Sequence, residues 1–236
     1  MDTNKNARKI FAKTKTLLTA GAVAGPLFTL TWILESVTRA DYNLLRHPVS
    51  SLALGEFGWM QVVNFILAGL LVLAFAWGLW LALRTQRGSI WGSLLVAIWG
   101  IGLLGAGVFL TDPVSGYPPR SPDILLNPTA YGALHNQISL LGFLALTRAC
   151  FVFSYIFATQ GKRGWAMYSV VTGVLFPLGI ILSSMAFSQN VSLVAFGGLL
   201  QRLTVTIGWT WLTSLAIHIR KSVTESSSPP IYFNLY

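Results

Sequence analysis

The amino-acid sequence predicts an all-α, polytopic transmembrane bundle of six helices, with the N- and C-termini both cytoplasmic. Three observations support this class. Of the 236 residues, 54% are hydrophobic and 10% are charged, whereas soluble domains carry about 25% charged residues. The apolar residues fall into six runs of about 20 residues or more, the length that crosses ~30 Å of hydrocarbon. The basic residues gather in short segments on one side of the predicted membrane.

The first predicted helix follows a basic segment. Residues 1–15 have little to bury and are expected to be cytoplasmic; their basic residues are Lys5, Arg8, Lys9, Lys13 and Lys15. An apolar run at about 16–36 then forms the first span. Gly21 and Gly25 lie one turn apart in it and provide a small-residue face for helix packing.

Five further helices complete a transmembrane domain over residues 16–221. Their expected ranges are about 59–83, 89–111, 134–159, 165–187 and 193–218. The 89–111 helix carries Gly100, Gly102, Gly105 and Gly107, which favour close approach of a neighbouring helix. Residues 222–236 are rich in Ser and Pro and are expected to form a flexible cytoplasmic tail.

The distribution of charge predicts the orientation. Eleven of the 16 basic residues lie in segments on the side of the N-terminus, and five of the seven acidic residues lie in segments on the opposite side. Cytoplasmic segments of membrane proteins carry the excess of Lys and Arg, so both termini are expected to be cytoplasmic.

Composition also excludes several classes of function. The net charge of +9 is spread over the ends of apolar runs, where basic residues set topology, so nucleic acid is not an expected partner. Cys150 is the only cysteine, which excludes an intrachain disulfide and a multi-cysteine metal site. No phosphate-binding loop or dinucleotide fingerprint occurs, and no cofactor is predicted.

Polar residues gather at the outer ends of the predicted helices and in two long outer connections, residues 36–58 and 111–134. We expect them to form an outer-face pocket that binds a ligand. The expected ligand-binding residues are Glu35, His47, Ser50, Ser51, Asp112, His135 and Arg202. A lipid, a small anion or a partner protein are all compatible with such a pocket.

Two arginines fall within predicted spans. Arg202 lies about 12 Å below the outer end of the sixth helix, and Arg148 lies about 21 Å into the fourth. A charge at such depth faces the bundle interior or a wet cavity and needs partners. Arg202 is expected either to bind an anionic group entering from outside or to serve structure, through an ion pair with Glu35 or Asp112 or by snorkelling to the interface. Arg148 is expected to be structural.

Three residues are candidates for catalysis. His47, Asp112 and His135 are able to hold a metal that activates water, with Ser50 or Ser51 beside the substrate. His135 and Asp112 alone are able to act as a general acid/base pair. The structural alternative is that both histidines cap helices. No H-x-x-x-H pair occurs and the third histidine, His218, lies on the cytoplasmic side, so no metal is predicted.

Several short motifs resemble a known family. They are H-P-V-S-S-L-A-L-G-E-F-G-W-M-Q-V-V-N-F-I-L-A-G (His47–Gly69), F-L-T-D-P (Phe109–Pro113), G-Y-P-P (Gly116–Pro119) and L-H-N (Leu134–Asn136). Together they resemble domain of unknown function 998, a family of six-helix prokaryotic membrane proteins, over roughly residues 15–220. The resemblance implies six spans, an outer position for the histidine and aspartate motifs, and a prokaryotic cell membrane. It implies no activity. Ser51 stands where an acidic residue is expected in the first motif, which argues against catalysis or metal binding there.

Three hypotheses for function remain. The first is a non-enzymatic membrane protein that binds a lipid, a small anion or a partner protein in the outer pocket. The second is a membrane-embedded hydrolase or transferase that acts on a lipid headgroup through His47, Asp112 and His135. The third is an accessory subunit of a larger membrane complex, whose helices stabilise neighbouring proteins or pigments.

Overall fold

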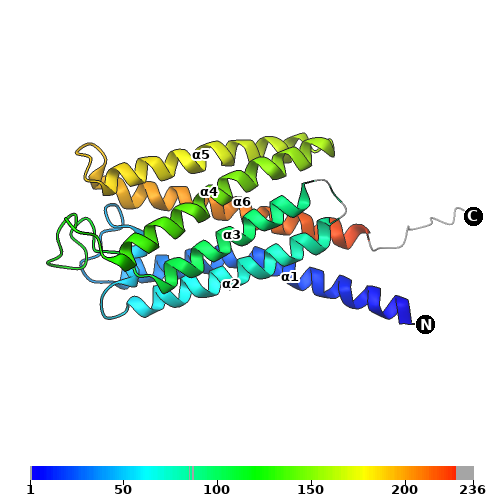
Figure 1. The fold of residues 1–236 in the computed structure, drawn as a ribbon, viewed down its shortest axis with the longest axis horizontal. Helices are drawn as coiled ribbons and strands as arrows, with labels where there is room; N and C mark the ends of the chain where they lie inside the picture. Colours follow the sequence, from blue (N-terminus) through cyan, green and yellow to red (C-terminus); the bar gives the residue numbers. More distant parts are fainter. Residues whose placement is uncertain (1, 85, 87, 227–236) are drawn as a thin grey trace, which may run out of the picture.

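A computed structural model describes residues 2–84, 86 and 88–226 and shows an all-helical chain (Figure 1). Six α-helices and two short 3-10 helices follow one another along it. They are α1 (Asp2–Thr38), η1 (Val49–Ala53), α2 (Gly58–Leu83), α3 (Ser89–Val108), α4 (Ala130–Thr159), α5 (Arg163–Phe187), η2 (Val194–Phe196) and α6 (Gly197–Ser226).

The six helices form a closed ring of alternating direction. Each helix packs against its neighbours in the chain, and α6 packs against both α5 and α1, so that the last helix closes the ring. The first residues of α1 and the last residues of α6 lie at the same end of the bundle (Figure 1). This end also holds the α2–α3 and α4–α5 connections, and we call it the basic end. The opposite end holds residues 39–57, 109–129 and 188–196, and we call it the loop end.

Glycines set the spacing between α2, α3 and α4. A Cβ added to Gly69 of α2 would lie 2.9 Å from the carbonyl oxygen of Gly100 in α3. A Cβ added to Gly102 of α3 would lie 3.0 Å from the Cα of Gly142 in α4. Backbones approach this closely only where side chains are absent, as the glycine pattern in α3 predicts.

Five helices are long and apolar enough to cross a membrane: the Lys9–Thr38 part of α1, and all of α2, α3, α4 and α5. The sixth helix is less apolar because it carries polar residues that the bundle encloses. Arg202 and Thr204 are 6% and 2% exposed, respectively. These two positions face other helices, and they lower the hydropathy of α6 together with polar residues on its exposed face, such as Thr206 and Thr210. The chain is therefore a six-helix, multi-pass membrane bundle.

Two helices begin earlier than the apolar pattern indicates. The first begins at Asp2, so the basic residues extend it beyond the apolar run; no Gly or Pro interrupts residues 2–15, and Lys, Arg and Ala all favour helix. The fourth begins at Ala130, after the cap residue Thr129. Of the predicted tail, residues 222–226 continue α6, and residues 227–236 lie outside the described residues.

The orientation can be tested by chemical labelling. Cys150 is buried, and Cys150→Ser gives a background without thiols. In this background we expect Glu56→Cys, at the loop end, to react with a membrane-impermeant maleimide in intact cells. Gly164→Cys, in open space at the basic end, should react only after permeabilisation. The reverse pattern would overturn the cytoplasmic placement of the termini.

Candidate functional site

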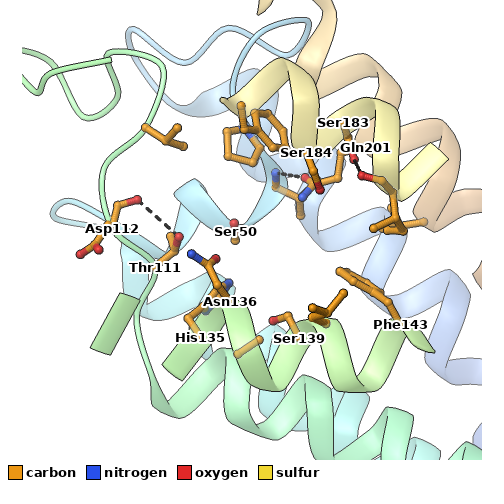
Figure 2. A pocket seen from close by; sticks show the side chains of 18 of the residues that line it. Ser50, Thr111, Asp112, His135, Asn136, Ser139, Phe143, Ser183, Ser184 and Gln201 are labelled. Atoms are coloured by element: carbon orange, nitrogen blue, oxygen red, sulfur yellow. Dashed lines mark hydrogen bonds between the residues drawn. The ribbon is translucent and has the colours of Figure 1, made fainter. Parts of the chain in front are cut away.

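A cavity of about 590 Å³ opens at the loop end of the bundle (Figure 2). All six helices contribute to its lining, together with η1 and the α3–α4 connection. This volume is within the range of small-molecule sites, about 300–1,000 Å³. The site is therefore a property of the whole ring and not of one motif.

The cavity separates α4 from α5. Lower in the bundle these helices are in contact, with ring centroids of Phe143 and Phe176 5.8 Å apart. Nearer the loop end, residues of α4 line one wall and residues of α5 line the other, as Figure 2 shows for Ser139 and Ser184. The ribbons of α4 and α5 diverge in the same direction (Figure 1). The cavity thus lies between α4 and α5 at the loop end of the ring.

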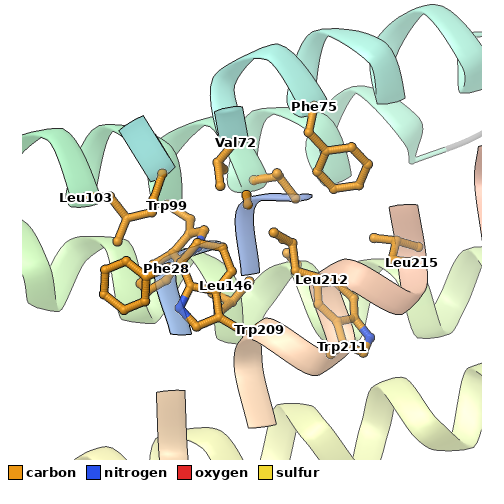
Figure 3. Close-up of a cluster of buried hydrophobic side chains, with 14 of the residues drawn as sticks. Phe28, Val72, Phe75, Trp99, Leu103, Leu146, Trp209, Trp211, Leu212 and Leu215 are labelled. Carbon is orange, nitrogen blue, oxygen red and sulfur yellow. The ribbon is translucent and has the colours of Figure 1, made fainter. Parts of the chain in front are cut away.

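The floor of the cavity is aromatic. Phe28, Phe65, Trp99, Phe143 and Trp209 line it, and most of them belong to the buried core (Figure 3). The rings of Trp99 and Trp209 lie 5.8 Å apart in an edge-on arrangement. Such packing fixes large side chains in place, so the floor is a rigid aromatic surface, in which the indole N–H groups of Trp99 and Trp209 have no partner among the described residues.

The upper walls are polar, with little charge. Asp112 is the one charged residue among the described residues that line the cavity, and no Lys or Arg is among them. Seven polar lining side chains have no hydrogen-bond partner within the described part of the chain: Ser50, Asn136, Ser139, Ser184 and Ser188 at the walls, and the indole N–H groups of Trp99 and Trp209. These hydroxyls and amide supply both donors and acceptors at the mouth of the cavity.

Asp112 anchors the start of α4. Its Oδ2 accepts from the backbone N–H of Thr129 at 2.9 Å, and its Oδ1 accepts from the Thr129 hydroxyl at 2.7 Å. Thr129 in turn accepts from the backbone N–H of Gly132 at 3.0 Å. A Cβ at position 132 would collide with the Asp112 carboxylate. A carboxylate at a helix N-terminus is favoured by the free N–H groups there, so Asp112 has a local structural role.

His135 ties α4 to the end of α3. Its Nδ1 lies 2.8 Å from the carbonyl oxygen of Phe109, and the side chain is 5% exposed. A carbonyl only accepts, so Nδ1 carries the hydrogen, and the neutral ring keeps its acceptor lone pair on Nε2. Both His135 and Asp112 therefore line the cavity, each held by a partner of its own.

The other predicted histidine is not part of the cavity. The Nδ1 of His47 accepts from the backbone N–H of Asn43 at 2.9 Å. The ring packs between Tyr42 and Tyr117, with centroids 5.4 and 5.1 Å away. Burial lowers the pKa of His47, against the opposing effect of a hydrogen bond to the Ser115 backbone. His47 is thus a neutral side chain that holds the first outer connection together.

Of the other predicted site residues Ser50, Ser51 and Glu35, only Ser50 lines the cavity. Ser50 lines the cavity, whereas Ser51 is fully buried and its hydroxyl has no partner among the described residues. Glu35 is 2% exposed and pairs with Arg39, Nη2 to Oε2, at 3.0 Å. Arg39 also donates to the carbonyl of Phe57 at 3.0 Å. This pair joins the end of α1 to the turn before α2.

Arg202 is buried, and its partners are neutral. The guanidinium donates to three carbonyls, those of Leu44 (2.7 Å), His47 (2.8 Å) and Gly198 (2.9 Å), and to the hydroxyls of Ser36 and Tyr42. It also lies over the rings of Trp32 and Tyr42, 5.2 and 5.4 Å from their centroids. The predicted ion pairs with Glu35 or Asp112 are not among its contacts. Its charge is stabilised by backbone dipoles and aromatic faces.

Tyr42 completes this arrangement. Burial raises its pKa to about 12, so the hydroxyl stays protonated and donates to the carbonyl of Pro48 at 2.7 Å while it accepts from Arg202. The next residue of α6, Gln201, accepts from the backbone N–H of Val49 at 2.7 Å and lines the cavity. The contacts of Arg202 and Gln201 therefore fix the roof of the cavity, η1, on the start of α6.

Arg148 lies neither in the lining of the cavity nor among the contacts of Arg202. Its side chain is exposed on α4 and has no hydrogen-bond or ion-pair partner within the described part of the chain. No group of three or more His, Cys, Asp or Glu side chains positioned to hold a metal ion occurs among the residues that the structure describes.

Sequence reasoning did not single out Asn136, Ser139, Ser184 or Gln201 as site residues. One signal was available. Asn136 is the last residue of the L-H-N motif, and Ser139 lies three residues later on α4, which places the two on one helical face. Of the serine pair Ser183–Ser184, Ser183 donates to the Ile180 carbonyl of its own helix, and the hydroxyl of Ser184 has no partner among the described residues.

The family comparison agrees with this architecture. The family whose model matches is described as "Protein of unknown function (DUF998)", and the match covers residues 22–218. The chain belongs to the DUF998 family. No curated protein and no solved structure matches it. The DUF998 match runs from the middle of α1 to α6, so it includes the whole ring and every residue that lines the cavity.

Removing the Arg202 guanidinium should destabilise this DUF998 protein. Arg202→Met removes the charged donor to the Leu44 and His47 carbonyls of the outer connection and to the Gly198 carbonyl of α6, and we expect a loss of about 3 kcal/mol or more, since hydrogen bonds to charged groups contribute about 1.5–3 kcal/mol each. Thermal unfolding in detergent measures this loss of stability. Arg148→Met is the matched control and should unfold close to wild type. Equal effects of the two substitutions would contradict the role given to Arg202.

Acid should weaken the first outer connection through His47. Because the folded-state pKa of His47 is lowered, its contribution to stability is complete above the ordinary histidine pKa of about 6.5 and is lost as pH falls through the lower folded-state value. The melting temperature of wild type should therefore fall more between pH 7 and pH 5 than that of His47→Gln. An identical fall in both proteins would contradict this account.

Proposed function

We propose that this protein binds an amphiphilic molecule with a neutral, hydrogen-bonding headgroup in the cavity between α4 and α5. One observation carries the proposal: unpaired, uncharged polar side chains surround the mouth of a cavity whose floor is aromatic and whose walls are formed by α4 and α5. An apolar chain matches the floor, and hydroxyl, ester or amide groups match Ser50, Asn136, Ser139 and Ser184.

The charge of the lining argues against an anionic headgroup. Arg202, the cation first expected to bind an anion, has its hydrogen bonds directed to the loop carbonyls and the Tyr42 hydroxyl. Asp112 is the charged residue in the lining, and it would repel an anion. A diacylglycerol-like lipid or another neutral polyol lipid therefore fits the site better than phosphatidylglycerol.

The second candidate function is hydrolysis or transfer at a lipid headgroup. The observation that favours it is His135, whose ring lines the cavity with Nδ1 held by Phe109 and the Nε2 lone pair available to act as a base. Asp112 does not complete a dyad with it, because both carboxylate oxygens are bonded to Thr129. Binding is therefore the better-supported function.

Blocking the cavity should abolish lipid retention. Ser139→Phe adds a ring inside the opening, whereas Leu141→Phe adds the same ring on a side chain that is 61% exposed on the same helix, outside the lining. With dioleoylglycerol and phosphatidylglycerol offered together, we expect native mass spectrometry to show preferential retention of dioleoylglycerol by wild type. The Ser139→Phe variant should retain at least about tenfold less, equivalent to about 1.4 kcal/mol.

The Leu141→Phe control should retain lipid as wild type does. Loss in both variants, or retention of phosphatidylglycerol at the same level as dioleoylglycerol, would contradict the proposal. Release of a free headgroup or fatty acid in the same samples, absent in His135→Gln, would favour the hydrolase in its place.

A further inference from the structure

A second cavity, of about 520 Å³, lies at the basic end of the bundle. The ends of α1, α2, α4 and α6 surround it, and so do the α2–α3 and α4–α5 connections. A hydrogen bond joins the two connections: Gln160 Nε2 donates to Gln86 Oε1 at 2.8 Å, and both side chains line the cavity. The cavity shares no lining residue with the first.

Its charge is opposite to that of the first cavity. Arg84 and Lys162 are among its lining residues, and no Asp or Glu is among them. Arg84 is exposed and has no partner among the described residues. Lys162 Nζ lies 3.2 Å from His218 Nε2, which accepts from the ammonium only if the imidazole is neutral. Two cations thus line one cavity, and no carboxylate is among the described residues of its lining.

The deeper walls of this cavity are apolar. Phe11 of α1, Ile156 and Phe157 of α4, and Ile219 of α6 line it below the cations. The cavity lies where four helices end, among the basic residues that mark the headgroup layer of the cytoplasmic leaflet in membrane proteins. A ligand that suits it has a negative charge at one end and hydrocarbon at the other.

We propose that this second cavity binds the phosphate of an anionic phospholipid, with the phosphate between Arg84 and Lys162 and the first part of the acyl chains against the apolar walls. Guanidinium and ammonium groups both bind phosphate oxygens through charge-assisted hydrogen bonds. The inference is independent of the function proposed for the first cavity, since it concerns different residues and the opposite end of the bundle.

The test compares two double variants with the same change in net charge. Arg84→Gln/Lys162→Gln removes the cations that line the cavity. Arg163→Gln/Arg220→Gln removes two exposed cations of the same end that are outside its lining. Dioctanoyl phosphatidylglycerol and dioctanoyl phosphatidylcholine are titrated into the purified full-length chain, and binding is followed by native mass spectrometry. Melting temperatures without lipid show whether each variant is folded.

We expect phosphatidylglycerol to bind wild type and the control variant alike, and to bind the cavity variant about 25-fold more weakly. This factor follows from about 1 kcal/mol for each basic residue at an anionic lipid surface. Equal weakening in both double variants would overturn the proposal, because it would indicate a general surface attraction. Equal binding of phosphatidylcholine would overturn it as well.

Inorganic phosphate and glycerol 3-phosphate distinguish a lipid from a soluble source of the same chemistry. Neither should displace phosphatidylglycerol at 10-fold excess if the apolar walls contribute to binding. Displacement by either anion at equal concentration would overturn the assignment of a lipid ligand. If the cavity variant is unfolded, the single variant Arg84→Gln, at an exposed position, provides the same comparison with Arg163→Gln.

Discussion

The buried guanidinium of Arg202 holds the loop end of this bundle in place. A charge in the interior of a membrane protein is costly unless its donors are satisfied, and here the acceptors are carbonyls of the first outer connection and the hydroxyl of Tyr42. The planar fork of arginine reaches several acceptors at once, which a lysine ammonium does not do in the same geometry. The path of the connection over α6, and with it the position of η1 above the cavity, depends on this interaction.

The same interaction explains two features that are unusual when taken alone. The sixth helix is not among the five that are apolar enough to cross a membrane by composition, and Arg202 in its second turn, which binds the outer connection, contributes to this. The cavity beside it is nearly uncharged because the arginine closest to the roof directs both of its Nη groups to the outer connection, to Ser36 and to its own helix. A neutral cavity at one end and a cationic cavity at the other are therefore products of how the chain distributes a small number of charges.

Much of the fold could be predicted from the sequence, because bilayer thickness fixes the length of each apolar run and small residues mark close helix contacts. The end of the bundle at which polar residues gather was also predictable. Their partners were not. Whether His47 meets His135 depends on the rotation of each helix and on the path of a 19-residue connection, and neither is encoded in local periodicity. Arg202 is an example. Three of its acceptors are backbone carbonyls, which every residue has, so no pattern of side chains in the sequence predicts which carbonyls it binds.

The parting of α4 from α5 has a consequence for how the first cavity is filled. A lipid of the kind proposed would reach an opening between two neighbouring helices from the plane of the membrane. Its occupancy would then follow its mole fraction among the surrounding lipids, and its arrival would be a two-dimensional search. The opening also sets no upper limit on chain length, since a tail too long for the cavity simply extends into the bilayer. Discrimination among lipids would then rest with the few polar atoms at the mouth.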